Sequence, residues 1–158
     1  MDRDKIIYEV LPTGELDRIG PLWEALRLHH REKSPFFKER YDRLSFADRK
    51  KALLEKDELL IDAAFVASSG EMVGYCVSSL IRKEDQVEGE VDSILVAPAF
   101  QKLGIGITLM SRAMAWLDGK NPGSIKIVVA AGNEEVFPFY ETFGFHHFSN
   151  VLMKRKPK

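Results

Sequence analysis

Residues 96–117 constrain the fold more than any other segment, because there an apolar run passes into an amphipathic helix through a proline and two glycines. Val96 ends the run, Pro98 turns the chain, and Gly104 and Gly106 lie where the helix begins. Amides in a first helical turn lack intrahelical acceptors and carry the positive end of the helix dipole. Glycines let an anion reach those amides, so the segment predicts a pyrophosphate site. The helix itself is predicted from an apolar stripe at Ile105, Leu109, Met110, Ala113, Met114 and Leu117.

Two other phosphate-binding loops do not fit this segment. A Walker A loop requires Gly-Lys-Ser/Thr, but Gly106 is followed by Ile107 and Thr108. A dinucleotide-binding fingerprint requires a third glycine where this chain has Leu109. Taken alone, the two glycines also fit a tight helix entry without any ligand.

The rest of the chain predicts an α/β (α+β) fold with the element order β-α-α-β-β-β-α-β-α-β. Alternating and continuous apolar runs indicate strands, and apolar residues at steps of three and four indicate helices. Hairpin and crossover connections together imply a mixed sheet with helices on both faces. The predicted strands are 5–11, 59–68, 72–82, 90–96, 125–131 and a closing strand or short hairpin at 145–154, and the predicted helices are 16–33, 45–56, 105–117 and 133–144.

Composition favours one domain spanning residues 1–158. The chain has 23 basic and 24 acidic residues, a net charge of −1, which argues against a general nucleic-acid binder. The single cysteine, Cys76, cannot form an internal disulfide, and no signal peptide or membrane-spanning run is evident. We therefore expect a cytoplasmic protein without nucleic-acid or membrane partners. No metal site is expected, because the adjacent histidine pairs 29/30 and 146/147 point their side chains in different directions.

Two motifs resemble the GNAT superfamily of N-acetyltransferases. The run from Gln101 to Gly106 matches the pattern Gln/Arg-x-x-Gly-x-Gly/Ala, and Val96-x-Pro98 extends the match upstream. Downstream, Asn133-x-x-Val136-x-x-Phe139-Tyr140-Glu141-x-x-Gly144-Phe145 resembles a second segment of that family. The resemblance implies a mostly antiparallel, twisted sheet and acetyl-CoA as cosubstrate. Two departures are Val136 at a usually small position and Pro138 in the expected helix, which we expect to begin late so that the proline lies in its first turn.

The resemblance also implies which residues contact acetyl-CoA. The glycine loop would hold the pyrophosphate through main-chain amides, and the pantetheine arm would lie between two strands that part, 90–96 and 125–131. Asn133 would bond the pantetheine, although it also fits a plain helix N-cap. The implied cofactor-binding residues are Leu95, Val96, Gln101, Lys102, Leu103, Gly104, Ile105, Gly106, Thr108, Asn133 and Tyr140.

Acetyl transfer to an amine needs a proton acceptor for the ammonium, and the departing thiolate benefits from a proton donor. The resemblance assigns the donor role to Tyr140. Glu90 and Asp92 alternate along one predicted strand and share a face, so either carboxylate could be the base, directly or through water. A solvated strand end explains the two carboxylates equally well.

The sequence therefore predicts an N-acetyltransferase that transfers acetyl from acetyl-CoA to a primary amine in a ternary complex. A small-molecule acceptor is favoured over a protein N-terminus or lysine, because the chain has no extra domain to hold a polypeptide. Acceptor contacts are expected at residues 29–32, 35–37 and 84–85. The alternative is a non-catalytic acyl-CoA sensor or interaction module. Relatives of this family are often dimers, so a homodimer is compatible with the resemblance.

Overall fold

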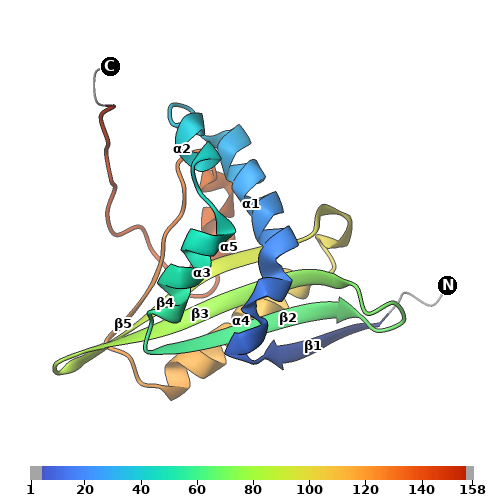
Figure 1. The fold of residues 1–158 in the computed structure, drawn as a ribbon. Coiled ribbons are helices and arrows are strands. Elements are labelled where there is room, and N and C mark those ends of the chain that lie inside the picture. The colour runs from blue at the N-terminus through green and yellow to red at the C-terminus, as the bar shows by residue number, and fades with distance from the viewer. Residues whose placement is uncertain (1–4, 156–158) are drawn as a thin grey trace.

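The computed structural model describes residues 5–155 and contains a five-stranded sheet whose strands follow one another in sequence order (Figure 1). The first four strands pair antiparallel, and the last pairs parallel with its neighbour. The mixed, mostly antiparallel sheet expected from the sequence is confirmed. The strands are β1 (Ile6–Leu11), β2 (Glu58–Val66), β3 (Met72–Lys83), β4 (Gln86–Val96) and β5 (Ser124–Ile127).

Helices cover both faces of this sheet, as predicted (Figure 1). On one face α4 (Ile105–Gly119) buries its apolar stripe, including Leu109 and Leu117, against β3 and β4. On the other face, the 3₁₀ segment η1 (Thr13–Ile19), α1 (Gly20–Lys33) and α3 (Phe46–Leu54) pack around Trp23 and Tyr75. Each face therefore has its own hydrophobic core, with the sheet between them.

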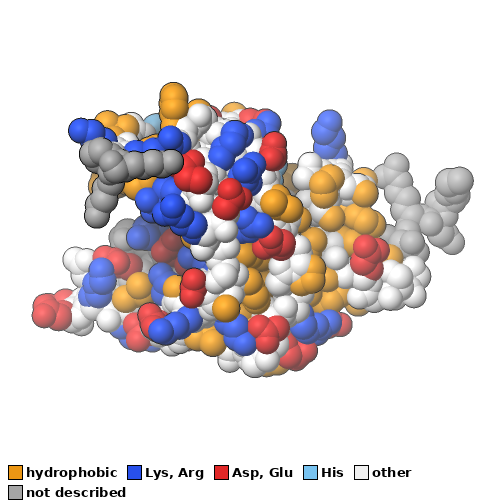
Figure 2. Space-filling view, turned by 45° about the horizontal axis from the view of Figure 1, so that its top comes forward, with side chains coloured by type: hydrophobic (Ala, Val, Ile, Leu, Met, Phe, Trp, Pro, Cys, Tyr) orange, Lys and Arg blue, Asp and Glu red, His pale blue; other side chains and the backbone are white. Residues whose placement is uncertain are grey.

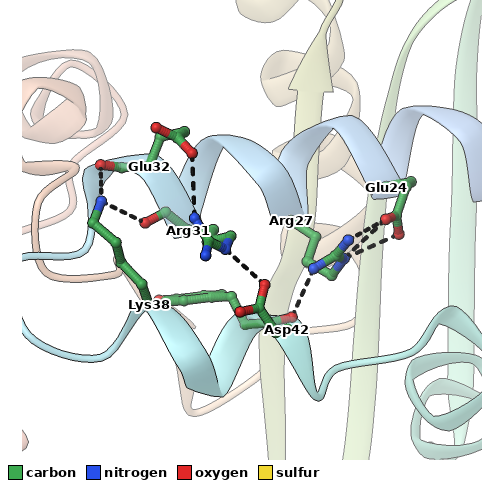
Figure 3. A network of polar contacts seen from close by, with 7 residues as sticks. Glu24, Arg27, Arg31, Glu32, Lys38 and Asp42 are labelled. Carbon is green, nitrogen blue, oxygen red and sulfur yellow. Dashed lines mark hydrogen bonds and ion pairs between the residues drawn. The ribbon is translucent and has the colours of Figure 1, made fainter.

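The segment between α1 and α3 contains a short helix, α2 (Lys38–Asp42), that the sequence analysis did not predict. Polar contacts to α1 hold it in place (Figure 3). Arg27 donates to the carbonyl of Tyr41 at 2.8 Å, and Arg31 donates to Asp42 at 2.6 Å. These contacts join residues that lie 14 and 11 positions apart in the sequence, so the spacing of apolar residues along one helix could not predict them. The helix α3 begins after the capping residue Ser45, whose Oγ accepts from the Asp48 amide at 3.1 Å.

β4 is longer than predicted and contains a β-bulge. It begins at Gln86 rather than residue 90, and a tight turn connects it to β3, where Lys83 pairs with Gln86. Val91 pairs with Ser78 and Ser93 with Val77, so Asp92 is the additional residue of the bulge.

The predicted strand 125–131 is only partly present, since β5 ends at Ile127. The predicted closing strand or hairpin at 145–154 is wrong: that segment is extended but belongs to no strand. A strand requires a hydrogen-bonded neighbour, and the described part of the chain offers none to this segment. The observed order therefore ends on helix rather than strand, with η2 (Pro98–Phe100), η3 (Glu134–Val136) and α5 (Phe137–Glu141) as the remaining helical segments.

Helix α5 begins late, close to its proline. Pro138 lies in the first turn of α5, as predicted.

None of the helices within residues 5–155 combines the length and apolar character needed to cross a bilayer. In Figure 2, basic and acidic side chains are interspersed over the visible face.

Candidate active site

The site begins where β4 and β5 part. The two strands pair only from Glu88 with Ser124 to Val91 with Ile127, and beyond that point the described chain shows no ladder between them. A cavity of about 510 Å³ occupies the gap. Its walls are the end of β4, Ser93 to Val96, and the end of β5 with the three residues after it, Ile127 to Ala130. Parts of the glycine loop, α1 and the segment around α5 complete the walls. The parting of the strands that the family resemblance implied is therefore present.

At one end of the cavity the glycine loop leads into α4. Gly104 is the N-cap residue and has a φ of +82°, a left-handed conformation that favours glycine. The carbonyl of Gly104 accepts the helical bond from the Thr108 amide at 3.0 Å, so amides of the preceding turn have no intrahelical acceptor. A Cβ on Gly104 would meet nothing within 4 Å, which leaves open space at this helix N-terminus. Lys102, with a φ of +66°, helps to curve the loop.

Gln101 fastens the loop to the end of β4, because its side-chain amide donates to the carbonyl of Val96 at 3.0 Å. Gln101, Lys102, Gly104 and Gly106 line the cavity together with Leu95 and Val96. The Ile105 side chain lies in the core instead, so only its amide is available to a ligand. Of the other predicted contacts, Leu103 is exposed, and neither Leu103 nor Thr108, a candidate hydroxyl donor, is among the residues that line the cavity.

The segment after β5 closes over the cavity and contacts α1. Asn133 occupies the N-cap position of η3, but its side chain makes no capping bond. Its Oδ1 instead lies 3.3 Å from His29 Nε2 on α1, and both residues line the cavity. The backbone at Gly132 lies against the carbonyl of Lys33, and the Lys33 ammonium pairs with Glu135 at 3.9 Å. Helix α1 and this segment thus form one wall.

Tyr140 lies on α5 and lines the cavity. Its ring contacts Phe139 and Phe145, with centroids 5.4 and 6.4 Å away. Burial raises the pKa of the Tyr140 phenol to about 12, and the nearby Cys76 adds to the effect. The phenol therefore keeps its proton at neutral pH, which suits a hydrogen-bond or proton donor.

The two candidate bases differ in position. Both face the ammonium of Lys56, which lies 3.5 Å from Glu90 and 3.7 Å from Asp92, so the predicted shared face is present. Only Asp92 lines the cavity, because Glu90 still pairs with Lys126 on β5, whereas Asp92 follows Val91, the last residue of β4 that pairs with β5. The Asp92 side chain is 1% exposed, and among the described residues its Oδ2 has no hydrogen-bond partner. Burial raises the pKa of Asp92, the Ser79 hydroxyl offsets part of this rise, and the neighbouring Glu90 carboxylate adds to it.

Helix α1 forms one wall of the cavity, whereas the sequence predicted only that residues 29–32 contact the acceptor. Leu26, His29 and His30 line the cavity, whereas Phe36, Phe37 and Glu84 do not. Burial lowers the pKa of His30, and its Nδ1 lacks a partner among the described residues. The helical periodicity placed these positions on one turn of α1, but only the packing of α1 across β4 brings them to the cavity.

Cys76 is a buried residue: it is 1% exposed, and burial raises the pKa of its thiol to about 12. Within residues 5–155, no cluster of three or more His, Cys, Asp or Glu side chains is arranged to hold a metal ion.

Comparison with known proteins defines the class to which this fold and cavity belong. The model of the acetyltransferase (GNAT) family matches residues 23–145. The chain therefore belongs to the GNAT acetyltransferase family. No curated protein sequence matches it.

Solved structures of acetyltransferases share the fold along nearly the whole chain. A Trypanosoma brucei acetyltransferase is 17% identical with a TM-score of 0.65, covering 96% of this chain and 100% of its own. The aminoglycoside acetyltransferase meta-AAC0020, from an uncultured soil metagenomic sample, is 14% identical with a TM-score of 0.63, covering 97% and 96%. AAC(6')-Iy, in complex with the bisubstrate analogue CoA-S-monomethyl-acetylneamine, is 17% identical with a TM-score of 0.61, covering 98% and 99%. At these identities the similarity shows the fold alone.

Proposed function

We propose that this protein transfers the acetyl group of acetyl-CoA directly to a primary amine of a small molecule, with both substrates bound at once. The observation that carries the proposal is the cavity between the parted ends of β4 and β5, which runs from the glycine loop to α1. The pantetheine arm would lie between the end of β4 and the residues that follow β5, which both line the cavity. The acceptor would then enter from the side where Leu26, His30 and Asp92 form the wall.

Free amides at the start of α4 would bind the pyrophosphate. The glycines leave the backbone open to an anion, and the helix dipole favours negative charge there. Lys102 lines the same end of the cavity and would add a positive charge. The backbone of Leu95 and Val96 and the amide side chain of Asn133 would hold the pantetheine.

The proton path would run from the acceptor ammonium to Asp92. An alkylammonium, with a pKa of about 10.4, cannot attack until it loses a proton. Asp92 lines the cavity with one unpartnered oxygen, and its raised pKa makes it a better proton acceptor than an ordinary carboxylate. The Lys56 ammonium contacts both the Asp92 and the Glu90 carboxylates.

The nitrogen then bonds to the acetyl carbon while the bond from that carbon to sulfur breaks. Tyr140 would donate its phenolic proton to the departing thiolate and regain one from solvent. Its neutral form at ordinary pH supports this role. Within the structural neighbours, one is described as an aminoglycoside acetyltransferase and another holds a CoA analogue joined to an aminosugar, which makes aminoglycosides a first class of acceptor to test.

The test measures acetyl-CoA binding by calorimetry and CoA release by thiol detection, across aminoglycosides, diamines, amino acids and a peptide with a free N-terminus. The proposal expects saturable acetyl-CoA binding and release of CoA that depends on one class of small amine. Tight binding with no amine-dependent release would identify an acyl-CoA sensor instead. Failure to bind acetyl-CoA would refute the assignment of the glycine loop as well.

A further inference from the structure

Lys56 is a cation that faces both carboxylates of β4. It lies in the turn between α3 and β2, and its ammonium is 3.5 Å from Glu90 Oε1 and 3.7 Å from Asp92 Oδ1. The Lys56 side chain is 19% exposed, and those of Glu90 and Asp92 are 17% and 1% exposed. Charges that water screens so little interact more strongly than ion pairs on an open surface. The charge of Lys56 therefore acts directly on both carboxylates.

Backbone hydrogen bonds on either side fix the turn that carries Lys56. The Lys56 amide donates to the carbonyl of Leu53, a fully buried residue of α3, at 3.1 Å. The next amide, that of Asp57, donates to the carbonyl of Leu80 on β3 at 3.0 Å. β3 also pairs with β4 along the stretch that carries the two carboxylates. The turn and the carboxylates are thus attached to the same strand, which holds the ammonium in place beside them.

A second cation near Asp92 acts on its backbone. Arg49, on α3, donates to the main-chain carbonyl of Asp92 at 2.9 Å. Within residues 5–155, Lys56 is the cation that lies within ion-pair distance of the Asp92 carboxylate itself. The two cations therefore have different effects: Arg49 holds the backbone of the bulge, and Lys56 faces the reactive group.

The remaining titratable groups around Asp92 come from four elements of the sheet and from α1. They are Glu90 on β4, Tyr75 and Cys76 on β3, Lys126 on β5, which pairs with Glu90 at 3.8 Å, and His29 and His30, which line the same cavity from α1. Burial raises the pKa of Tyr75 and Cys76 and lowers that of His30, so these three groups are neutral near pH 7. Lys56 is therefore the main counter-charge to the Asp92 carboxylate.

We propose that Lys56 is a positioning residue that holds the buried Asp92 carboxylate in its charged form, ready to take a proton from the acceptor amine. The inference rests on the proposed role of Asp92 as the base. A buried carboxylate with a second one beside it prefers its neutral form, and a neutral Asp92 cannot accept a proton. Burial raises the pKa of Asp92, and the Lys56 cation opposes that rise. Lys56 does so from outside the cavity lining, so it leaves the space for the acceptor free.

The test follows two titrations. Carboxyl carbon NMR measures the titration of Asp92 in the protein without substrates, with the signal assigned by its loss in Asp92→Asn. Steady-state kinetics, with acetyl-CoA and the amine from the panel above that releases CoA fastest, measure the acid limb of kcat/KM. In Lys56→Met both should move to higher pH by about one unit, because the cation no longer favours the carboxylate. Lys56→Arg keeps the charge and should stay close to the wild type.

Lys50→Met is the matched control. Lys50 is also a lysine of α3, and its ammonium pairs with Asp17 at 2.9 Å, on the side of α3 that faces η1. Replacing it removes one lysine charge and one ion pair without touching β4. Both titrations should stay at their wild-type positions.

Removal of the second carboxylate separates an effect of charge from an effect of packing. Glu90→Gln should move the Asp92 titration to lower pH, opposite to Lys56→Met, because the neighbouring negative charge is gone. The double variant Lys56→Met/Glu90→Gln should return toward the wild-type position. A role of Lys56 in packing alone predicts no such compensation.

Three outcomes overturn the inference. They are an Asp92 titration that does not move in Lys56→Met, one that moves to lower pH, and one that moves while the acid limb of kcat/KM stays in place. In the last case Lys56 would not act through the base. If no amine in the panel releases CoA, the proposed function fails instead, and the NMR titration of the substrate-free protein still decides whether Lys56 holds Asp92 in its charged form.

Discussion

Gly132 lies so close to Lys33 that a Cβ added to the glycine would stand 1.9 Å from the Lys33 carbonyl oxygen. The glycine also has a φ of +97°, which side chains rarely adopt. This contact, between the segment after β5 and the end of α1, sets one wall of the cavity. It requires glycine for two independent reasons, steric and conformational.

Gly132→Ala should therefore loosen this wall. We expect a loss of about 1–3 kcal/mol in the free energy of unfolding from the overlap, together with weaker acetyl-CoA binding. Denaturant unfolding and calorimetry measure the two effects. Gly119→Ala is the control, since a Cβ there meets nothing within 4 Å, and it should leave the protein as stable or slightly more stable. Unchanged stability in Gly132→Ala would mean that the contact is not tight in solution.

Gly104→Glu should abolish acetyl-CoA binding, because it puts a negative charge and bulk at the helix N-terminus where the pyrophosphate would bind. Gly70→Glu separates this effect from backbone strain. Gly70 has a φ of +74°, close to the +82° of Gly104, and both positions have open space around the Cβ. Both variants should lose about 1–2 kcal/mol in stability, whereas only Gly104→Glu should lose ligand binding in calorimetry. Equal affinity in the two variants would remove the glycine loop from the site.

Tyr140→Phe should lower kcat by about 10²-fold with little change in acetyl-CoA affinity, because the phenol acts only on the departing sulfur. Since burial raises the pKa of Tyr140 to about 12, activity should show no loss from its ionisation at ordinary alkaline pH. Steady-state kinetics from acid to alkaline pH measure both. Tyr8→Phe, on β1 outside the cavity, should keep full activity. A Tyr140→Phe enzyme with undiminished kcat would exclude the donor role.

Much of the fold was predictable because it rests on local patterns. The apolar stripe of α4, the Ser45 cap and the late start of α5 before Pro138 each depend on residues within one or two turns. The start of α4 at the two glycines was predicted in the same way, and Gly104 is its N-cap residue. In each case, the residue types at neighbouring positions were enough to predict the local structure.

Features that depend on distant partners were not predictable. α2 is held by Arg27 and Arg31 through contacts across the chain, and the bulge at Asp92 appears only when β3 is paired with β4. The point where β4 and β5 stop pairing lies between Glu90 and Asp92, so alternation along one strand could not show which of the two carboxylates lines the cavity. The predicted closing strand at 145–154 is absent for a related reason: a segment with a strand-like sequence forms a strand only where a neighbouring strand can pair with it.

The thiol of Cys76 should be unreactive in the folded protein. Burial raises its pKa to about 12, and the side chain is 1% exposed, so almost no accessible thiolate exists at neutral pH. Alkylation followed by mass spectrometry should modify Cys76 only in denaturant. Rapid labelling of the native protein would show that β3 opens readily. Acetyl transfer should likewise survive treatment with an alkylating reagent under native conditions.

Asp92→Asn should remove the acid limb of the kcat/KM profile if Asp92 is the base, whereas Glu90→Gln should keep that limb. The base form of Asp92 is lost as the pH falls through its raised pKa, so wild-type activity should decline there.

The raised pKa of Asp92 also makes the stability of the protein depend on pH. The folded protein holds the Asp92 proton more tightly than does the unfolded chain, in which the pKa of Asp is about 3.8. This stabilisation is fully present below about pH 3.8 and is lost as the pH rises through the raised pKa of Asp92 in the folded protein. Asp92→Asn should therefore raise Tm at neutral pH relative to the wild type, with the difference shrinking toward acid. An unchanged kcat/KM profile in both variants would assign the proton to water, and a Tm difference that grew toward acid would contradict the raised pKa.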